Sequence, residues 1–129
     1  MPSFGTLKAD TLTHSTAGSL DTNYVVEGAI KHRGHYDQYL VTVSSLTDSL
    51  NNSSVSDGGT GDVTVNRTAA FANTGYSSSG GTNFNGTVMF SSSAGKYTTT
   101  ATQVLTKTTS TLAAADNNNT SFMISGDLA

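Results

Sequence analysis

The sequence predicts an all-β fold, either an antiparallel β-sandwich or a small jelly-roll-like domain, with an extended N-terminal arm. Thr, Ser, Gly and Asn together make up about half of the 129 residues, and this mixture favours strands and turns. Short segments alternate apolar and polar side chains with the period of two that half-buried strands show. No segment keeps helical periodicity for three turns, so strands and turns are expected throughout.

The composition argues against several classes of protein. Only 12% of the residues are charged and there is one proline, whereas disordered chains are usually rich in both. Because there is no cysteine, disulfides and thiolate metal sites are excluded. A formal net charge of −3 without a basic run predicts no direct nucleic-acid partner. No apolar stretch reaches the roughly 20 residues that span a bilayer, and the first residues lack a Sec-type signal pattern, so we expect no membrane span and no leader.

A chain of 129 residues is expected to form a single domain. Residues 1–22 are predicted to form an N-terminal arm or first strand, and residues 13–23 look like a turn. Residues 23–129 are predicted to form the sandwich. The strands expected within it are 24–30, 36–46, 63–68, 84–90, 97–107 and 121–125, with an irregular strand over 48–55 and a short polar strand beginning at Tyr76.

The clearest alternation lies in the strand expected over 36–46. Tyr39, Val41 and Val43 share one face, and Gln38, Leu40 and Thr42 share the other. Such a pattern is typical of a strand with one face buried. Two polar stretches, 31–35 and 77–82, are predicted to be connections instead.

The strongest turn signal is the run DGGTGD from Asp57 to Asp62. Glycine adopts positive φ without steric cost, and Asp-Gly is a favoured hairpin pair. We therefore expect a tight hairpin here, with positive φ at Gly58 or Gly61.

The segment from Asp48 to Tyr76 reads DSLNNSSVSDGGTGDVTVNRTAAFANTGY. It resembles a block that recurs in small and fibre-like proteins of marine tailed bacteriophages, including cyanophages, with the approximate form D-S-x-N-V-S-S-I/L-T-D-N-G-T-G-D-Y-T-V-N-F, a short link and A-N-x-N-Y. The opening LKADTL, Leu7 to Leu12, is similar to the L-K-V-D-T-I/L start of such proteins. Two positions depart from the pattern. Arg67 stands where the family has an aromatic residue, and KHRGHY from Lys31 to Tyr36 replaces a strand of the form K-x-W-V-N-F.

The resemblance implies a structural protein of the bacteriophage virion and no catalytic activity. The chain also has neither a Gly-x-Ser-x-Gly elbow nor a lysine-bearing phosphate loop. We predict a non-enzymatic protein exposed on the virion, first a capsid decoration or cement protein and alternatively a tail-fibre or tail-tip subunit for host attachment. The implied partners are major capsid or tail proteins. A further alternative is a carbohydrate-binding or adhesin module that meets a host surface glycan through Tyr36, Tyr39, Tyr76, Tyr97 and Phe84.

Two groups of side chains have the chemistry of weak metal sites. His32 and His35 with Asp37 offer two imidazoles and a carboxylate, as zinc or nickel sites do. Asp57 and Asp62 offer carboxylates around a glycine turn, as calcium sites do. A solvated loop and hairpin geometry explain both groups better, so we predict no metal, cofactor or catalytic residue. The predicted subunit-contact residues are Lys31, His32, Arg33, His35 and Tyr36.

The small share of hydrophobic residues predicts that the chain assembles with other chains. Only 35% of the residues are hydrophobic, and no disulfide is available to strengthen the fold. Small β domains also leave sheet edges unpaired, and neighbouring subunits are one way to cover them. We therefore expect a homo-oligomer whose contacts involve the N-terminal arm and residues 31–37. The resemblance to phage proteins, which are frequently trimers, implies three copies as the first expectation.

Overall fold

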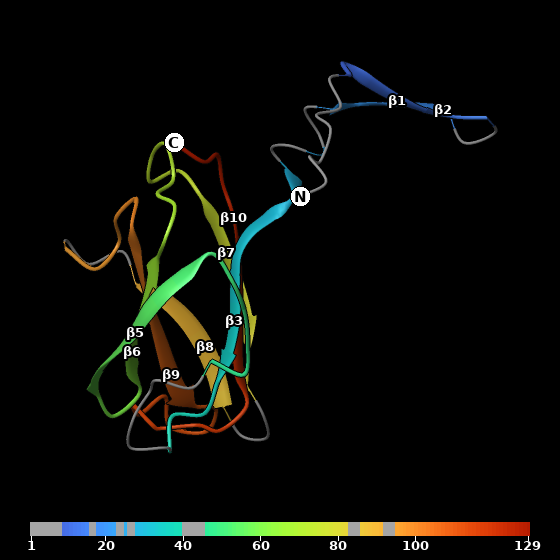
Figure 1. Cartoon of the computed structure of the whole chain (residues 1–129). Coiled ribbons are helices and arrows are strands. Elements are labelled where there is room, and N and C mark those ends of the chain that lie inside the picture. The colour runs from blue at the N-terminus through green and yellow to red at the C-terminus, as the bar shows by residue number, and fades with distance from the viewer. Residues whose placement is uncertain are drawn as a thin grey trace.

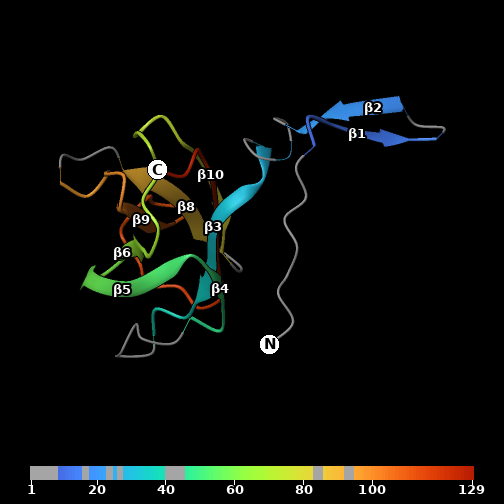
Figure 2. The same ribbon diagram turned by 45° about the horizontal axis from the view of Figure 1, so that its top comes forward.

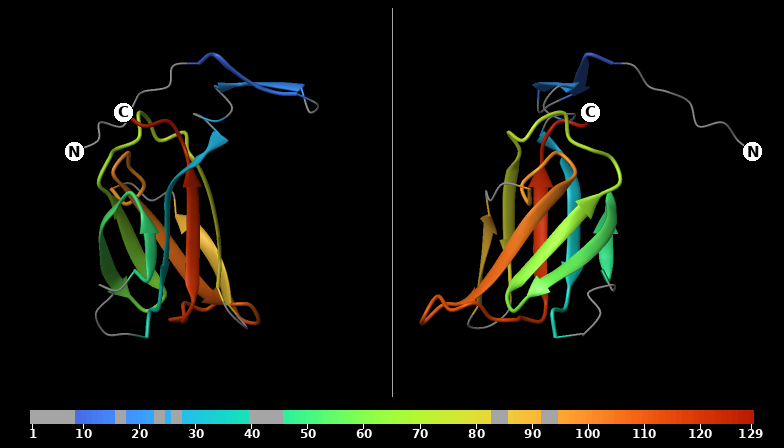
Figure 3. Two further views of the ribbon diagram at one scale, coloured as in Figure 1. Left: turned by 45° about the vertical axis from the view of Figure 1, so that its right-hand side comes forward. Right: turned by 90° about the vertical axis from the view of Figure 1, so that its left-hand side faces the viewer.

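The structure, a computed structural model, describes residues 9–15, 18–22, 25, 28–39, 46–82, 86–91 and 95–129. In these ranges two four-stranded antiparallel sheets pack face to face, and a two-stranded hairpin stands beyond one end of the sandwich (Figures 1 and 3). The predicted all-β antiparallel sandwich is therefore confirmed. The strands are β1 Thr11–His14, β2 Gly18–Asp21, β3 Ile30–Tyr36, β4 Asp48–Leu50, β5 Asn52–Gly59, β6 Asp62–Arg67, β7 Ser77–Gly81, β8 Gly86–Ser91, β9 Ala101–Thr108 and β10 Thr120–Ser125.

The two sheets have the strand orders β4-β3-β10-β7 and β5-β6-β9-β8. At each side of the sandwich the chain changes sheets, from β4 to β5 on one side and from β7 to β8 on the other. Strand β10 enters the centre of the first sheet and pairs with both β3 and β7. The first and last strands of the sandwich are therefore neighbours, and this pairing joins the two ends of the domain (Figure 3).

Alternate strand positions fill the core between the sheets. Val63 and Val65 on β6 are completely buried, as is Val104 on the neighbouring β9. Strand β10 presents Phe122 and Ile124 to them from the opposite sheet. This is the period-two burial that the sequence predicts for residues 63–68 and 121–125, and both strands are confirmed.

Threonine takes part in the same core. Thr102, Thr106 and Thr120 are completely buried. The Thr106 hydroxyl lies 2.8 Å from Gln38 Oε1 and 2.7 Å from the Ala115 carbonyl oxygen, two acceptors that satisfy it. Paired hydroxyls cost little on burial, which lets a Thr-rich chain form an interior.

The prediction of a connection over 31–35 was wrong, because these residues form the middle of β3. His32, Gly34 and Tyr36 are buried on the inner side, while Arg33 and His35 between them are more exposed. The alternation is present, but its inward positions carry a histidine and a glycine in place of aliphatic residues. A pattern based on apolar side chains does not recognise such a strand.

The strands predicted on either side of 31–35 also differ from those in the structure. The one expected over 24–30 begins only at Ile30, and the described residues Val25, Gly28 and Ala29 lie outside any strand. The one expected over 36–46 is wrong at its start, because Tyr36 ends β3 and a turn follows at Gln38. Residues 40–45 lie outside the described part of the chain.

Gly34 leaves room for the core. A Cβ atom added there would lie 2.8 Å from Leu46 Cδ2 and 2.8 Å from the Phe122 ring atoms Cε1 and Cζ. Any side chain would displace the ring. The glycine that made the segment resemble a loop is therefore a packing requirement of the strand.

Two further stretches predicted to be turns or loops are strands. Part of the turn-like stretch 13–23 is β2, which pairs with β1 so that Leu12 faces Leu20. The Ser/Gly stretch 77–82 contains β7, which pairs with β10 from Ser77 to Gly81. Their own side chains give little strand signal, and the pairing partner supplies the order. Residues 1–8 of the predicted arm lie outside the described residues.

The hairpin over 57–62 is confirmed as the link between β5 and β6. Gly59 and Gly61 have φ of 110° and 69°, so Gly61 is in the predicted conformation while Gly58 is not. A Cβ atom at Gly61 would lie 2.4 Å from the Thr106 carbonyl oxygen. The ladder shifts register between Asp57 and Gly59, so Gly58 sits at a bulge that carries β5 into the turn.

Candidate interaction surface

The solvent side of the sheet β4-β3-β10-β7 carries Arg33 and His35 of the sequence-predicted contact segment. The pairing register places Arg33 opposite Leu50 and Met123, and His35 opposite Asp48 and Ser121. Directly opposed residues share a face of the sheet. We name this the outer face, made up of Arg33, His35, Asp48, Leu50, Ser79, Ser121 and Met123.

The predicted contact residues divide between the two sides of β3. Arg33 and His35 belong to the outer face, and Lys31 lines a hollow beside it. His32 and Tyr36 point inward and are 0% and 1% exposed. The last two residues are therefore core residues and are removed from the predicted contact set.

Two polar pairs, Arg33–Asp48 and His35–Thr47, lie at one half of the outer face. Arg33 Nη1 forms an ion pair with Asp48 Oδ2, and the two side chains are 44% and 62% exposed. His35 Nδ1 lies 2.6 Å from Thr47 Oγ1. Exposed pairs of this kind contribute at most about 1 kcal/mol to folding, so their main effect is to set the charge pattern of the surface.

Met123 is an exposed apolar residue among serines in the other half of the outer face. It is 45% exposed and lines two hollows of about 230 and 150 Å³. Its cross-strand neighbour on β7 is Ser79, whose small side chain leaves the thioether uncovered. Methionine adapts to many partner shapes, which suits an exposed contact residue.

A larger hollow adjoins the outer face at the end of the sandwich where β3 begins. Its apolar lining comes from Ile30, Leu50, Ala69 and Leu128, and its volume is about 510 Å³. Ile30, Leu50 and Leu128 are 40%, 46% and 46% exposed. Exposed aliphatic side chains that converge in this way mark interaction sites on soluble proteins. We call this the apolar hollow; its remaining lining residues are Lys31, Ser49, Asn51, Asn52 and Thr68.

The N-terminal hairpin of β1 and β2 stands apart from the sandwich (Figures 1 and 2). Leu12 and Leu20 oppose one another across it and are 43% and 46% exposed. The ladder is short, with four paired positions. An isolated two-stranded ribbon is at best marginally stable in water, so this hairpin needs a surface to pack against.

The histidines that suggested a metal site do not converge. His32 points into the core and His35 lies on the outer face, because neighbouring odd and even positions of a strand project oppositely. In the part of the chain that the structure describes, no group of three or more His, Cys, Asp or Glu side chains is placed to hold a metal ion. Asp37 instead accepts a hydrogen bond from the Tyr39 amide at 2.9 Å.

Burial keeps His32 neutral. Burial lowers the pKa of His32 to about 4, and the positive charge of Arg67 acts in the same direction, against the hydrogen bond to Asn52. Nε2 lies 3.0 Å from Asn52 Oδ1, while Nδ1 is buried without a partner. A proton on Nδ1 would therefore add a buried charge with no acceptor.

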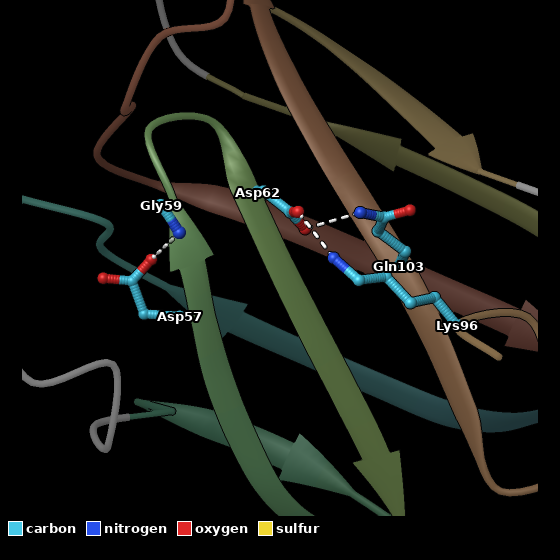
Figure 4. A network of polar contacts seen from close by, with 5 residues as sticks. All are labelled: Asp57, Gly59, Asp62, Lys96 and Gln103. Carbon is cyan, nitrogen blue, oxygen red and sulfur yellow. Dashed lines mark hydrogen bonds and ion pairs between the residues drawn. The ribbon is translucent and has the colours of Figure 1, made fainter. Parts of the chain in front are cut away.

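The aspartates that suggested calcium each have a local partner (Figure 4). Asp57 Oδ1 accepts a hydrogen bond of 2.8 Å from the Gly59 amide and so caps the bulge. Asp62 accepts bonds of 2.7 Å each from Lys96 and Gln103, on the far side of β6. Partial burial raises the pKa of Asp62, but the bonds from Lys96 and Gln103 outweigh it and leave the pKa below its usual range.

Arg67 is a buried cation that sequence reasoning did not identify as a packing residue. It is 4% exposed, and its guanidinium carbon lies 4.3 Å from the Phe71 ring centre and 4.5 Å from that of Tyr76. Nη1 donates to the Thr98 and Thr99 carbonyl oxygens at 3.1 and 3.2 Å, and Nη2 donates to Thr102 Oγ1. The only sequence signal was that an aromatic residue is expected here, which indicates a buried position.

The aromatic residues considered for a sugar platform do not share a surface. Tyr36 and Tyr76 are buried, and Tyr97 packs on Tyr76 with ring centres 4.5 Å apart. Tyr39 is 65% exposed and lies in the turn after β3. Phe84 lies outside the described residues.

The fold and the exposed surface together define a small all-β sandwich with a protruding hairpin and an outer face that combines exposed Leu50 and Met123 with the Arg33–Asp48 ion pair. No family model, curated protein or solved structure matches this chain. Within the described ranges, no helix is long and apolar enough to cross a membrane.

Proposed function

We propose that this chain is a non-enzymatic structural protein of a bacteriophage virion, exposed on the particle and acting as a capsid decoration or cement protein. One observation carries the proposal. The segment that resembles the phage proteins, residues 48–76, forms β4, the β5-β6 hairpin, and the end of the core that holds Phe71 and Tyr76. A resemblance spread over several strands and core residues is better support than one confined to a turn.

The two departures from the family pattern are compatible with the proposal. Arg67 replaces an aromatic residue, but it is buried and stacked on Phe71 and Tyr76, so the position keeps its packing role. Lys31 to Tyr36 replaces a strand of the family and is itself strand β3. The final aromatic residue of that family strand corresponds to Tyr36, which is buried here.

The outer face supports a role in assembly. A decoration protein must bind to the capsid lattice and to its own copies through exposed surfaces. Met123 and Leu50 expose apolar area beside the Arg33–Asp48 ion pair, so the outer face combines the apolar and charged groups that interfaces use. The tail-fibre or tail-tip role uses the same features at another place on the particle.

Gold labelling of intact virions tests the proposal. Antibodies raised against the purified chain are applied to particles of the phage that encodes it, and the gold is located by electron microscopy. Label distributed over the head is the expected result. Label confined to the tail contradicts decoration and supports the tail alternative, whereas purified particles that neither carry label nor contain the chain by mass spectrometry contradict a virion role altogether.

A further inference from the structure

The chain carries two exposed apolar features that match each other. One is the Leu12/Leu20 pair on the projecting hairpin, and the other is the apolar hollow at the end of the sandwich. Both are open to solvent, with every large apolar side chain in them 40–46% exposed. Water-exposed apolar surfaces of this kind are stabilised when they cover each other.

We propose that the hairpin of one copy packs its Leu12/Leu20 face into the apolar hollow of a second copy. This arm exchange between copies would be one way in which the proposed structural protein assembles, and the inference rests on that proposed function. The contact is head-to-tail, because the arm and the hollow are different surfaces of one chain. Contacts of this type close into rings when the rotation permits, and a ring of three copies is the simplest closed form consistent with the expected trimer.

The low stability of an isolated hairpin favours a state in which the hairpin is packed into the apolar hollow. The ribbon pairs over four positions only, and its described side chains are exposed on both strands. A ribbon of this size gains its order from an outside surface. In Figures 1 and 2 it projects away from its own sandwich, which leaves a neighbouring copy as a surface that it can reach.

Size and charge are compatible with the docking. Ile30, Leu50 and Leu128 give the hollow of about 510 Å³ an aliphatic part that leucine side chains can cover. Asp10 lies exposed at the base of the hairpin, one residue before β1, and Lys31 lies at the rim of the hollow. Opposite charges beside an apolar contact favour one orientation of docking.

Site-directed disulfide cross-linking tests the contact directly, because the chain contains no cysteine of its own. One population carries Leu20→Cys and an affinity tag, and the other carries Leu50→Cys without the tag. The two are mixed at micromolar concentration under mild oxidation, and the mixed dimer is recognised by its mass on a non-reducing gel. We expect the mixed dimer to form at least tenfold faster than with a Leu112→Cys partner, which replaces a leucine that is 60% exposed outside both surfaces.

Two results would overturn the proposal. One is a rate of mixed-dimer formation no greater than that of the Leu112→Cys control. The other is a link within a single chain carrying both Leu20→Cys and Leu50→Cys that forms at the same rate on hundredfold dilution, because the hairpin then docks on its own sandwich. Neither result bears on where the chain sits on the particle, which gold labelling decides separately.

Discussion

His32 on β3 donates a hydrogen bond from Nε2 to Oδ1 of Asn52 on β5, 3.0 Å away, and so connects the two sheets through the interior. The acceptor is an amide oxygen, which fixes the proton on Nε2 and leaves Nδ1 bare and buried. The ring also meets Phe122 edge-on at 4.9 Å between centres. His32 is therefore built into the core as a neutral side chain.

This arrangement predicts that acid destabilises the fold. The pKa of His32 is about 4 in the folded chain against 6.5 when unfolded, so the folded state binds fewer protons in that interval. Stability from this group is fully present above pH 6.5 and decreases as the pH falls towards 4, by about 3 kcal/mol in total. Urea unfolding at several pH values measures the loss.

The pH effect is assigned by two matched variants. His32→Gln removes the titrating ring, and we expect its stability to fall less steeply between pH 6.5 and 4 than that of the wild type. His35→Gln removes the outward histidine of the same strand and is the control for the loss of an imidazole from β3. Equal slopes for wild type and His32→Gln would show that other groups cause the acid sensitivity.

Arg67 is predicted to stabilise the end of the core through its flat, forked guanidinium. Arg67→Ala removes one donor each from the Thr98 and Thr99 carbonyl oxygens, which keep the Tyr76 hydroxyl and the Phe71 amide. It also removes the stacking on Phe71, so the free energy of unfolding should fall by about 3 kcal/mol. Arg67→Lys should recover less than half of the loss, because an ammonium cannot form the fork. Arg33→Ala, at the exposed ion pair, should cost no more than about 1 kcal/mol and serves as the control.

Gly61 is predicted to be the least replaceable glycine of the β5-β6 hairpin. Gly61→Ala combines a φ of 69° with a Cβ only 2.4 Å from the Thr106 carbonyl oxygen, so it should destabilise the fold by about 3 kcal/mol. Gly81→Ala adds a Cβ with nothing within 4 Å and should be nearly neutral. Thermal unfolding of both variants is the measurement, and similar melting temperatures would refute the hairpin geometry.

The packing at Gly34 predicts a compensating pair of substitutions. Gly34→Ala places a methyl group 2.8 Å from the Phe122 ring and should destabilise the fold by about 1–3 kcal/mol. Phe122→Leu removes the crowded ring atoms, so in that background the additional cost of Gly34→Ala should shrink. A double-mutant cycle measured by urea unfolding gives the coupling, and additive costs would contradict the direct contact.

Sequence reasoning identified the strands whose inward residues are aliphatic or aromatic. Strand β6 buries Val63 and Val65, and β10 buries Phe122 and Ile124, so their alternation is visible without a structure. Strand β3 was missed because two of its inward residues, His32 and Gly34, are not aliphatic and fit the core only through their contacts with other strands. The histidine there needs Asn52, which is distant in the sequence, and Gly34 needs the Phe122 ring from the last strand.

The candidate surface was predicted in part for the same reason. Arg33 and His35 were expected to face a neighbour and do lie on the outer face, but the period-two geometry of an unrecognised strand sent His32 and Tyr36 inward. Met123 lies beside them because β10, which carries it, pairs with β3. This contact joins residues 90 positions apart, and no local sequence pattern reveals it. The family strand K-x-W-V-N-F at Lys31 was the one signal that pointed to β3.

The mass of the purified 129-residue chain in solution tests whether this domain assembles through its exposed surfaces. Multi-angle light scattering after size exclusion at micromolar concentration is the measurement. We expect a homo-oligomer, with three copies as the first expectation, whose mass falls towards that of one chain when Leu12→Ser and Leu20→Ser are combined. A wild-type chain that is folded and remains a monomer of 13.3 kDa across this range would contradict it.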